Sequence, residues 1–293
     1  MRVNFELYRV FYYVASTLSF SEASRQLFIS QSAVSQAVKQ LEQKLECKLF
    51  LRTTKKISLT QEGERLFQYI EPAINLINAG EAQMITEDPL AGGMLRIGAS
   101  DSICRYFLIP YIERFHQKFP NVQISIINQT SKNCIGLLDN GQADIVIVNY
   151  PNAQIGSKYE LTELKSFKDV FLCGEKYRFL SEKEVSIKEL AEFPLLVLDA
   201  NSSTSDFLKQ IFRKNRIQLV PEFELTSNDL LIDLTKIGLG ITFVPDYCVP
   251  VDNAGVYNIQ VSEPYDERKL VAVINESLPV AAATREFLQL FVK

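Results

Sequence analysis

Two short helical patterns joined by a tight turn constrain the beginning of this chain more than any other feature of its sequence. The first covers residues 22–28 and follows Ser21, whose hydroxyl can cap a helix. Ser30, in the turn, can cap a second helix over residues 31–45. The apolar residues of that second helix share one face: Val34, Val38, Leu41 and Leu45. The pattern predicts a helix-turn-helix, whose second helix can enter the major groove of DNA.

The outward face of the second predicted helix is polar. Glutamine can donate and accept at an adenine edge, serine can bond to either kind of group, and lysine neutralises phosphate. The candidate DNA contacts on this face are Gln31, Ser32, Ser35, Gln36 and Lys39. Small polar residues on an exposed helix face often only stay hydrated, so this pattern alone leaves both interpretations open.

A short basic hairpin, or wing, is expected after this helix. It begins with residues 52–56 (RTTKK) and continues into the β-rich run 57–59. Thr60 can then cap the helix that follows. The candidate DNA contacts on the wing are Arg52, Lys55 and Lys56.

The charge is unevenly spread along the chain. The whole sequence carries a net charge of -4, yet residues 1–66 hold ten Lys and Arg against six Asp and Glu. This first part is therefore at +4 and the remainder at -8. A basic head on an acidic body is typical of a polyanion-binding module fused to another domain, although chance unevenness on solvated faces would look the same.

Taken together, these residues resemble the signature of the LysR-type transcriptional regulators. The matching positions span about 40 residues: Ala23–Leu27, Ser30–Ser35, Leu41, Glu42, Leu45, Leu49, Phe50, Arg52, Leu59, Thr60 and Gly63. Glu46 and Glu62 depart from the pattern, which usually has Gly and Ala there. Glu46 must close the second helix without the left-handed freedom of Gly, at a cost of about 1 kcal/mol. Neither departure touches the presumed DNA face.

The next segment, residues 66–87, carries a helical stripe of apolar residues: Leu66, Ile70, Ile74, Ile77 and Met84. The resemblance implies a linker helix that pairs with its twin in a dimer, but the stripe equally fits a helix packed on its own domain. Pro72 removes one backbone hydrogen bond and is expected to kink or split the helix. Residues 87–93 (EDPLAGG) then read as an interdomain linker.

Beyond the linker, β-rich runs alternate with helical patterns in two series. The first series has strands at 94–99, 122–127 and 144–149, with helices at about 102–118 and 132–141. The second series has strands at 169–173, 194–198, 223–225, 240–244 and 269–274, with helices near 204–215 and 227–237. Such alternation predicts βαβ units, parallel sheets and two α/β lobes.

The resemblance implies a periplasmic-binding-protein-like effector domain for this region. We therefore expect an α/β protein with a winged helix-turn-helix in residues 1–65, a linker helix in 66–87 and a two-lobed effector domain in 88–293. In that topology lobe 1 covers about 94–161 and 267–293, including a C-terminal helix at about 279–292. Lobe 2 covers about 162–266.

Four strand-to-helix turns are rich in hydroxyl groups, where ligands of open α/β sheets bind. The resemblance places an effector, for many relatives a carboxylate, in a cleft between the lobes. The candidate effector contacts are Ser100, Ser102, Thr130, Ser131, Ser203 and Thr204, with Phe243 as an apolar wall. Helix capping alone accounts for the same residue types. Asp101 adds a negative charge beside this expected site and so argues against a purely anionic ligand. Either it caps its own helix, or the ligand also carries an amine.

Several kinds of chemistry are not expected. A single histidine, His116, disfavours His-based metal sites and Ser-His-Asp catalysis, and five cysteines without CxxC spacing disfavour zinc fingers and disulfide frameworks. Cys104 and Cys134 are each expected near a helix start, where a thiol can become reactive, but a lone cysteine is more often a small buried hydrophobe. No GxGxxG, P-loop or GxSxG motif is present, so we expect no enzyme, no metal and no cofactor.

The sequence therefore predicts a DNA-binding regulator modulated by a small-molecule effector. Its expected partners are double-stranded DNA with a pseudo-palindromic site and the small-molecule effector. Further copies of the chain are expected in a homodimer or homotetramer, and RNA polymerase is a further candidate. No apolar run approaches the roughly 20 residues that span a bilayer and the charged N-terminus does not resemble a signal peptide, so we expect a cytoplasmic protein without a membrane partner. One alternative is a solute-binding module without a DNA role, against which the helix-turn-helix and the missing signal peptide argue. The other is an α/β enzyme, for which the sequence offers no catalytic motif and places no general base.

Overall fold

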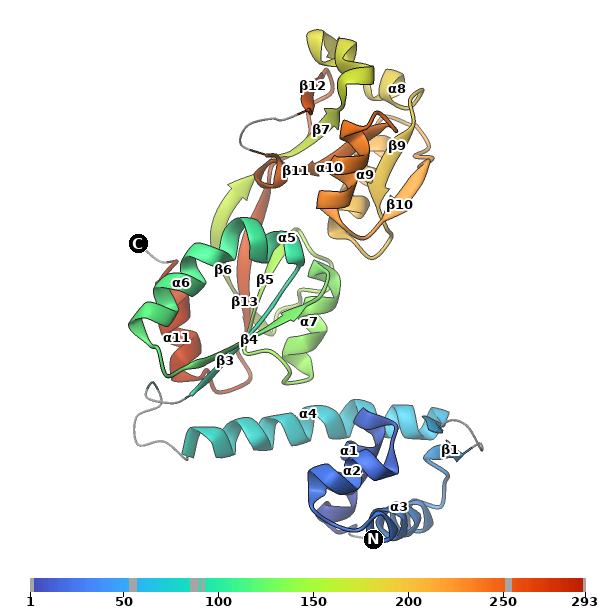
Figure 1. The fold of residues 1–293 in the computed structure, drawn as a ribbon, viewed down its shortest axis with the longest axis vertical. Coiled ribbons are helices and arrows are strands. Elements are labelled where there is room, and N and C mark those ends of the chain that lie inside the picture. Colours follow the sequence, from blue (N-terminus) through green and yellow to red (C-terminus); the bar gives the residue numbers. More distant parts are fainter. Residues whose placement is uncertain (1–2, 53–56, 85–89, 91–92, 251–254, 292–293) are drawn as a thin grey trace. The chain divides into compact units, whose positions relative to one another are not determined.

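The computed structural model describes residues 3–52, 57–84, 90, 93–250 and 255–291. The chain divides into two units, the first made of residues 1–85 and 139–142 and the second of residues 86–138 and 143–293 (Figure 1). Within the described residues, no helix has both the length and the apolar character needed to cross a membrane.

The first unit is a helical domain with a small hairpin. Its elements are α1 (Phe5–Thr17), α2 (Phe20–Leu27), α3 (Gln31–Leu45), β1 (Phe50–Arg52), β2 (Ile57–Leu59) and α4 (Gln61–Met84). β1 and β2 pair antiparallel, which confirms the expected hairpin. The buried core includes Phe11, Val34, Val38, Leu41 and Leu49, so the apolar stripe of α3 faces inward as predicted.

The caps of α2 and α3 define the helix-turn-helix. The Ala33 N–H donates to Ser30 Oγ (3.2 Å), as predicted, but α2 is capped by Ser19 rather than Ser21. The helix begins two residues earlier than expected because Phe20 is buried in the core. At the end of α3, Glu46 adopts the left-handed conformation (φ 56°, ψ 28°) in which Gly is favoured.

The helix α4 is continuous from Gln61 to Met84, so Pro72, which was expected to kink or split it, does not split it. Gln68, whose carbonyl loses its partner at Pro72, is exposed, so water can take the freed acceptor. The first half of the helix packs on its own domain: Leu66, Phe67 and Ile70 contact the core, and the Phe67 ring stacks on Tyr12 at 6.1 Å. A domain boundary at residues 65 and 66 therefore lies within a continuous helix.

The second unit contains two mixed sheets. The first sheet has the order β4-β3-β5-β13-β6. Its strands are β3 (Met94–Ala99), β4 (Gln123–Asn128), β5 (Ile145–Tyr150), β6 (Tyr159–Phe167) and β13 (Arg268–Asn275). The helices of this lobe are α5 (Asp101–Ile103), a π-helical turn (Cys104–Leu108), α6 (Ile109–Lys118), α7 (Ser131–Asp139) and α11 (Ala282–Gln289).

Alternating residues of β5 bury both faces of this sheet. Ile145 and Ile147 pack with residues of α6 and α11, whereas Val146 and Val148 pack against α7. Accordingly, α6 and α11 lie on one side of the sheet and α7 on the other (Figure 1). Burial on both faces explains why β5 reads as a continuous apolar run.

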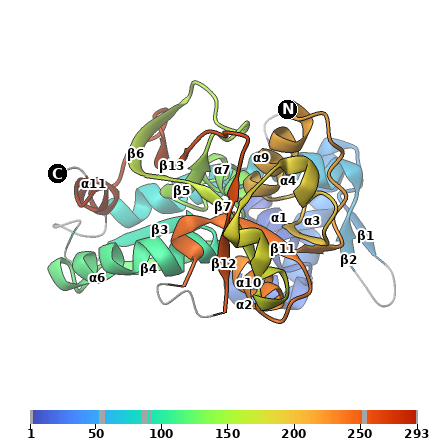
Figure 2. The same ribbon diagram turned by 90° about the horizontal axis from the view of Figure 1, so that it is seen from above.

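The second sheet has the order β10-β9-β11-β7-β12-β8. Its strands are β7 (Asp169–Cys173), β8 (Glu184–Val185), β9 (Leu195–Leu198), β10 (Phe223–Leu225), β11 (Ile241–Pro245) and β12 (Tyr257–Val261). Its helical segments are a 3₁₀ segment (Glu175–Glu182), α8 (Ile187–Leu190), α9 (Ser203–Lys214), α10 (Asn228–Lys236) and a 3₁₀ turn (Asp246–Cys248). The helices α9 and α10 cover opposite faces of this sheet (Figure 2).

Two expectations about the sheets are corrected. Parallel pairing holds for β3 with β4 and β5 and for β9 with β10 and β11, but β13 and β7 pair antiparallel with their neighbours. β6 and β12 also escaped prediction, because their exposed polar positions interrupt any apolar run. Since β6 extends to Phe167 and β7 begins at Asp169, the chain enters the second lobe at residue 168 rather than near 162.

Candidate functional site

The structure places the predicted DNA contacts of α3 on its outward face. Gln31, Ser32, Gln36 and Lys39 are exposed and Ser35 is half-buried. Ser32 Oγ lies 2.9 Å from Ser30 Oγ, so this hydroxyl is oriented by the cap of the helix. A groove of about 460 Å³ lies between α3 and β1, lined by Ser35, Lys39, Glu42, Lys48, Phe50 and Leu51. Of the wing candidates, Lys55 and Lys56 lie outside the described residues, and Arg52 is described only as the last residue of β1.

A buried carboxylate connects α3 to the residues that lead into β1. Glu42 Oε1 accepts hydrogen bonds from the N–H groups of Leu49 (2.9 Å) and Phe50 (3.4 Å), and Oε2 accepts one from Lys48 Nζ (2.9 Å). Burial by itself raises the pKa of Glu42, but these hydrogen bonds and the Lys48 charge outweigh it and hold the pKa below its ordinary value. Glu42 therefore positions the strand that leads into the wing.

This geometry predicts a pH-dependent contribution to stability. Because the pKa of Glu42 is lowered on folding, its contribution is complete above the unfolded-state pKa and is lost as the pH falls through the folded-state value. Glu42→Gln should destabilise the helix-turn-helix unit by about 1–2 kcal/mol at pH 7. The difference from the unchanged protein should shrink below about pH 4.5, near the carboxyl's unperturbed pKa.

Hydrogen exchange of the amides at residues 46–52 in the full chain, followed from pH 7 downward, would measure this effect. The matched control is Glu22→Gln, because within the described residues the Glu22 side chain forms only an exposed ion pair with Arg25 (3.1 Å). The control should change protection by under about 0.5 kcal/mol. Equal protection in Glu42→Gln and the unchanged protein at pH 7 would contradict the role of Glu42.

Gly63, the last residue of the sequence signature, has a steric role. Its N–H donates to Thr60 Oγ1 (2.9 Å), which confirms Thr60 as the cap of α4. A Cβ at Gly63 would collide with the Leu49 carbonyl oxygen, so only Gly allows the start of α4 to approach the strand of the wing.

In the second unit, a cavity of about 380 Å³ lies between the two lobes. All six predicted hydroxyl residues line it: Ser100, Ser102, Thr130, Ser131, Ser203 and Thr204. Phe243, predicted as a wall, does not line this cavity. It is 2% exposed in the core of the second lobe, where its ring packs 4.6 Å from that of Phe171. The prediction failed because inward and outward positions of a strand buried on both faces look alike in sequence.

Most of these hydroxyls already have structural roles. Thr130 Oγ1 accepts from the Asn133 N–H (3.3 Å), and Ser131 Oγ accepts from the Asn149 N–H (3.1 Å). Ser100 Oγ caps α5 by accepting from the Ile103 N–H (3.4 Å). These bonds orient the turns, and they leave first-turn N–H groups of α7 and α9 directed at the cavity end of each helix.

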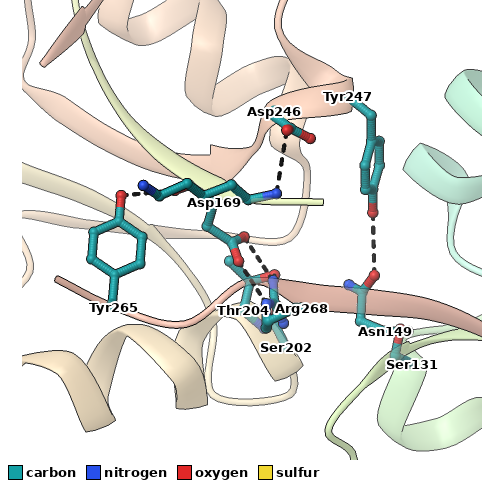
Figure 3. A network of polar contacts seen from close by, with 10 residues as sticks. Ser131, Asn149, Asp169, Ser202, Thr204, Asp246, Tyr247, Tyr265 and Arg268 are labelled. Atoms are coloured by element: carbon teal, nitrogen blue, oxygen red, sulfur yellow. Dashed lines mark hydrogen bonds and ion pairs between the residues drawn. The ribbon is translucent and has the colours of Figure 1, made fainter. Parts of the chain in front are cut away.

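Polar contacts bridge the two lobes around the cavity. Lys132 Nζ, at the start of α7, donates to the Ala200 carbonyl (2.7 Å) and pairs with Asp206 (2.6 Å). The Tyr106 hydroxyl hydrogen-bonds to Asp229 at the start of α10. Two more bonds cross between the lobes inside the cleft. Asn228 Nδ2 donates to Ser102 Oγ (2.8 Å), and the Tyr247 hydroxyl donates to Asn149 Oδ1 (3.2 Å; the latter bond is shown in Figure 3).

A fully buried ion pair lies where the chain crosses between the lobes. Arg268, the first residue of β13, donates to both carboxylate oxygens of Asp169, the first residue of β7 (2.6 and 2.7 Å) (Figure 3). Its Nη2 also donates to Thr204 Oγ1 (2.8 Å), and its guanidinium lies between the rings of Phe167 and Phe207. The ion pair thus connects both crossing strands to the first turn of α9.

Sequence reasoning missed several cavity residues. Asn128, Asn149, Asp199 and Tyr247 also line the cavity. Asn128 and Asn149 lie near the carboxyl ends of β4 and β5, so the rule that ligands bind at strand ends could have found them. Tyr247 follows β11 in a short 3₁₀ turn and carries no comparable signal in the sequence.

Two thiols were expected near helix starts of the first lobe, and their surroundings disfavour the thiolate form. Burial, and then the charge of Asp101, raises the pKa of Cys104 to about 11, and burial raises the pKa of Cys134 to about 12. Both thiols therefore stay protonated at neutral pH. In the described part of the chain, no three His, Cys, Asp or Glu residues come together as metal ligands would.

Two family models match this chain, and together they cover nearly all of it. Residues 5–64 match a model described as "Bacterial regulatory helix-turn-helix protein, lysR family". Residues 90–293 match a model described as "LysR substrate binding domain".

Individual relatives agree with these matches. The transcriptional regulator CrgA of Neisseria meningitidis is 28% identical over 262 residues, which cover 87% of this chain and 83% of CrgA. A full-length OxyR C199D structure from Pseudomonas aeruginosa is 19% identical and superposes with a TM-score of 0.72, covering 100% of this chain and 96% of that one. Full-length CbnR, solved in complex with its target DNA, is 14% identical with a TM-score of 0.70, and 99% of each chain is covered.

Proposed function

The chain belongs to the LysR family of DNA-binding transcriptional regulators and carries its effector-binding domain, and from this we propose how its residues divide the work. Residues 1–65 read a DNA site, residues 66–87 link and pair two copies, and residues 88–293 bind a small effector. The protein acts in the cytoplasm, with RNA polymerase as a partner at the promoter.

DNA is read by α3 and the wing. The observation that carries this proposal is the position of Gln31, Gln36 and Lys39 on the exposed face of a capped helix whose opposite face is the domain core. Gln31 and Gln36 can bond to base edges, and Lys39 can neutralise phosphate. Ser32 and Ser35 complete the helix face, while Arg52, Lys55 and Lys56 add positive charge at the wing.

The effector is proposed to be a small carboxylate or another small anion held between the lobes. The cavity volume of about 380 Å³ lies within the range of about 300–1,000 Å³ that is typical of small-molecule sites. First-turn N–H groups of α7 and α9, with the hydroxyls of Thr130 and Ser203, would bind the anion, because helix N-termini carry partial positive charge.

Effector binding would act on DNA through the lobes and the oligomer. A ligand between the lobes bears on the contacts that bridge them, including the ion pair of Lys132 and Asp206 (2.6 Å). A ligand that favours one lobe arrangement shifts the population of oligomer geometries and hence the spacing of the DNA heads. In a homodimer or homotetramer, twofold symmetry requires a pseudo-palindromic site with half-sites one or more helical turns apart.

Fluorescence anisotropy of the purified protein with DNA from upstream of its own coding region tests this proposal. We expect binding at least about 1,000-fold tighter than to unrelated competitor DNA at the same salt concentration. The affinity should fall as the salt concentration rises, because phosphate contacts release counterions. Equal binding to all fragments, with and without added carboxylates, would contradict a sequence-specific regulator.

A further inference from the structure

The charges inside the cleft do not match a ligand that is only an anion. Among the described residues that line the cavity, the charged side chains are Asp101 and Asp199, and none is basic. Two basic side chains near the cleft already form ion pairs: Lys132 with Asp206 (2.6 Å) and Arg268 with Asp169 (2.6 Å). The buried Nη1 of Arg268 has no hydrogen-bond partner in the described structure, but the charge of Arg268 is balanced by Asp169. A bound carboxylate would therefore meet helix N-termini and hydroxyls but no free cation in the described part of the chain.

The two cleft carboxylates differ in what they bind. Asp199 accepts from the N–H (3.0 Å) and the side-chain amide (3.4 Å) of Asn201, so it is used by its own loop. Asp101, at the start of α5, is exposed, and its carboxylate makes no hydrogen bond or ion pair within the described residues. Asp101 thus offers a negative charge to whatever occupies the cavity.

A second acceptor in the cavity lacks a donor. Asn228 is 9% exposed, and its Nδ2 donates to Ser102 Oγ (2.8 Å), but its buried Oδ1 has no partner in the described structure. Burying an acceptor without a partner costs free energy, so a ligand that donates a hydrogen bond there would recover it. Because Ser102 follows Asp101 in the chain and binds Asn228, both acceptors belong to the same end of the cleft.

N–H groups that can donate hydrogen bonds to a ligand lie at the starts of α7 and α9. The bonds from Lys132 to Ala200 and Asp206 hold the starts of α7 and α9 together. In these two helices the caps bind the N–H groups of Asn133 and Thr204, and the N–H groups of Ser131 and Ser203 are left for a ligand. All four helix starts supply N–H donors, but only the end formed by α5 and α10 adds two acceptors without a partner, the Asp101 carboxylate and Asn228 Oδ1.

From this arrangement we infer that the effector is a small zwitterion of the amino-acid type, carrying a carboxylate and an ammonium group. The carboxylate accepts from the first turns of α7 and α9. The ammonium group donates to the Asp101 carboxylate and to Asn228 Oδ1. The inference rests on the effector role proposed for the cleft and adds the cationic group to it.

The test compares matched ligands on the full-length protein. The probes are the free amino acids, the carboxylic acids that lack their amine, and the amines that lack their carboxylate, screened by thermal shift and measured by isothermal titration calorimetry. At least one amino acid should raise Tm, and its deaminated and decarboxylated analogues should bind about 10- to 100-fold more weakly.

Asp101→Asn separates the ammonium contact from the rest of the site. This variant should lose about tenfold or more in affinity for the amino acid and little for the deaminated acid, so the gap between the two ligands closes. Asp266→Asn is the matched control, because Asp266 is an exposed aspartate (84%) that does not line the cavity, and it should bind all probes like the unchanged protein.

Each outcome has a distinct meaning. If a deaminated acid binds as tightly as its amino acid, the zwitterion is wrong, while the cleft remains an effector site for carboxylates. If no amino acid binds, the inference is overturned, and the separate DNA-binding measurement still decides whether the protein is a sequence-specific regulator. If an amino acid binds with equal affinity to Asp101→Asn, the role of Asp101 is wrong.

Discussion

Arg268→Met is expected to lower the stability of the effector domain by about 3–5 kcal/mol, because it leaves the carboxylate of Asp169 buried without a partner. Asp169 is 0% exposed and Arg268 1% exposed, so water cannot replace the lost guanidinium. For a domain of this size, such a loss corresponds to a fall in Tm of roughly 10 °C. Thermal unfolding followed by circular dichroism measures it.

The pH dependence of this variant identifies the cause. Burial raises the pKa of Asp169, and the charge and hydrogen bonds of Arg268 oppose that rise. Without Arg268 the folded-state pKa rises further above the unfolded value, so stability is lost as the pH increases through the folded pKa. We therefore expect the difference in stability between Arg268→Met and the unchanged protein to be smaller at pH 5 than at pH 8.

A double variant, Asp169→Leu with Arg268→Met, is the control. Removing both charges replaces the pair with apolar groups and should restore most of the lost stability. A destabilisation below about 1 kcal/mol in the single variant would show that the buried pair is not what holds the crossing strands, and equal losses in the single and double variants would exclude an uncompensated charge as the cause.

Gln31→Ala and Ser35→Ala are expected to relax sequence preference by about 10- to 100-fold, because a good base contact discriminates by about 1–3 kcal/mol. Binding to unrelated DNA should hardly change, since neither side chain is charged. Competition anisotropy with the operator and with single-base variants of it measures both quantities. The matched control is Gln43→Ala, an exposed glutamine near the other end of α3, which should change the preference less than about twofold.

Replacing the lysines should change the overall affinity for DNA rather than the sequence preference. Lys39→Ala, and likewise Lys55→Ala or Lys56→Ala, should weaken binding to every sequence alike and reduce the slope of log affinity against log salt by about 1. If Gln31→Ala and Ser35→Ala leave the preference unchanged, the recognition face assigned to α3 is wrong. If a lysine variant changes preference rather than the salt slope, that lysine reads bases.

Local sequence patterns were sufficient to predict most of the individual helices and strands. The bounds of α3, β3, β7 and β10 agree with prediction, because apolar periodicity and capping residues act over a few neighbouring positions. Errors arose where burial depended on distant residues. Ser21 looked like a cap as good as Ser19, and the burial of Phe20 decided between them.

The sequence by itself determined the class of the protein, the helix-turn-helix with its outward polar face, and the hydroxyl-rich turns that line the cleft, because each depends on the order of nearby residues. Only the tertiary structure decided the antiparallel crossing strands, the ion pair between Asp169 and Arg268, and the position of Phe243 in the core. These features join positions as far as 99 residues apart, and such pairings follow from how the sheets pack rather than from any local pattern. Only the tertiary structure could also show which polar groups of the cleft are available to a ligand, because this depends on which of them already have hydrogen-bond partners in the folded protein.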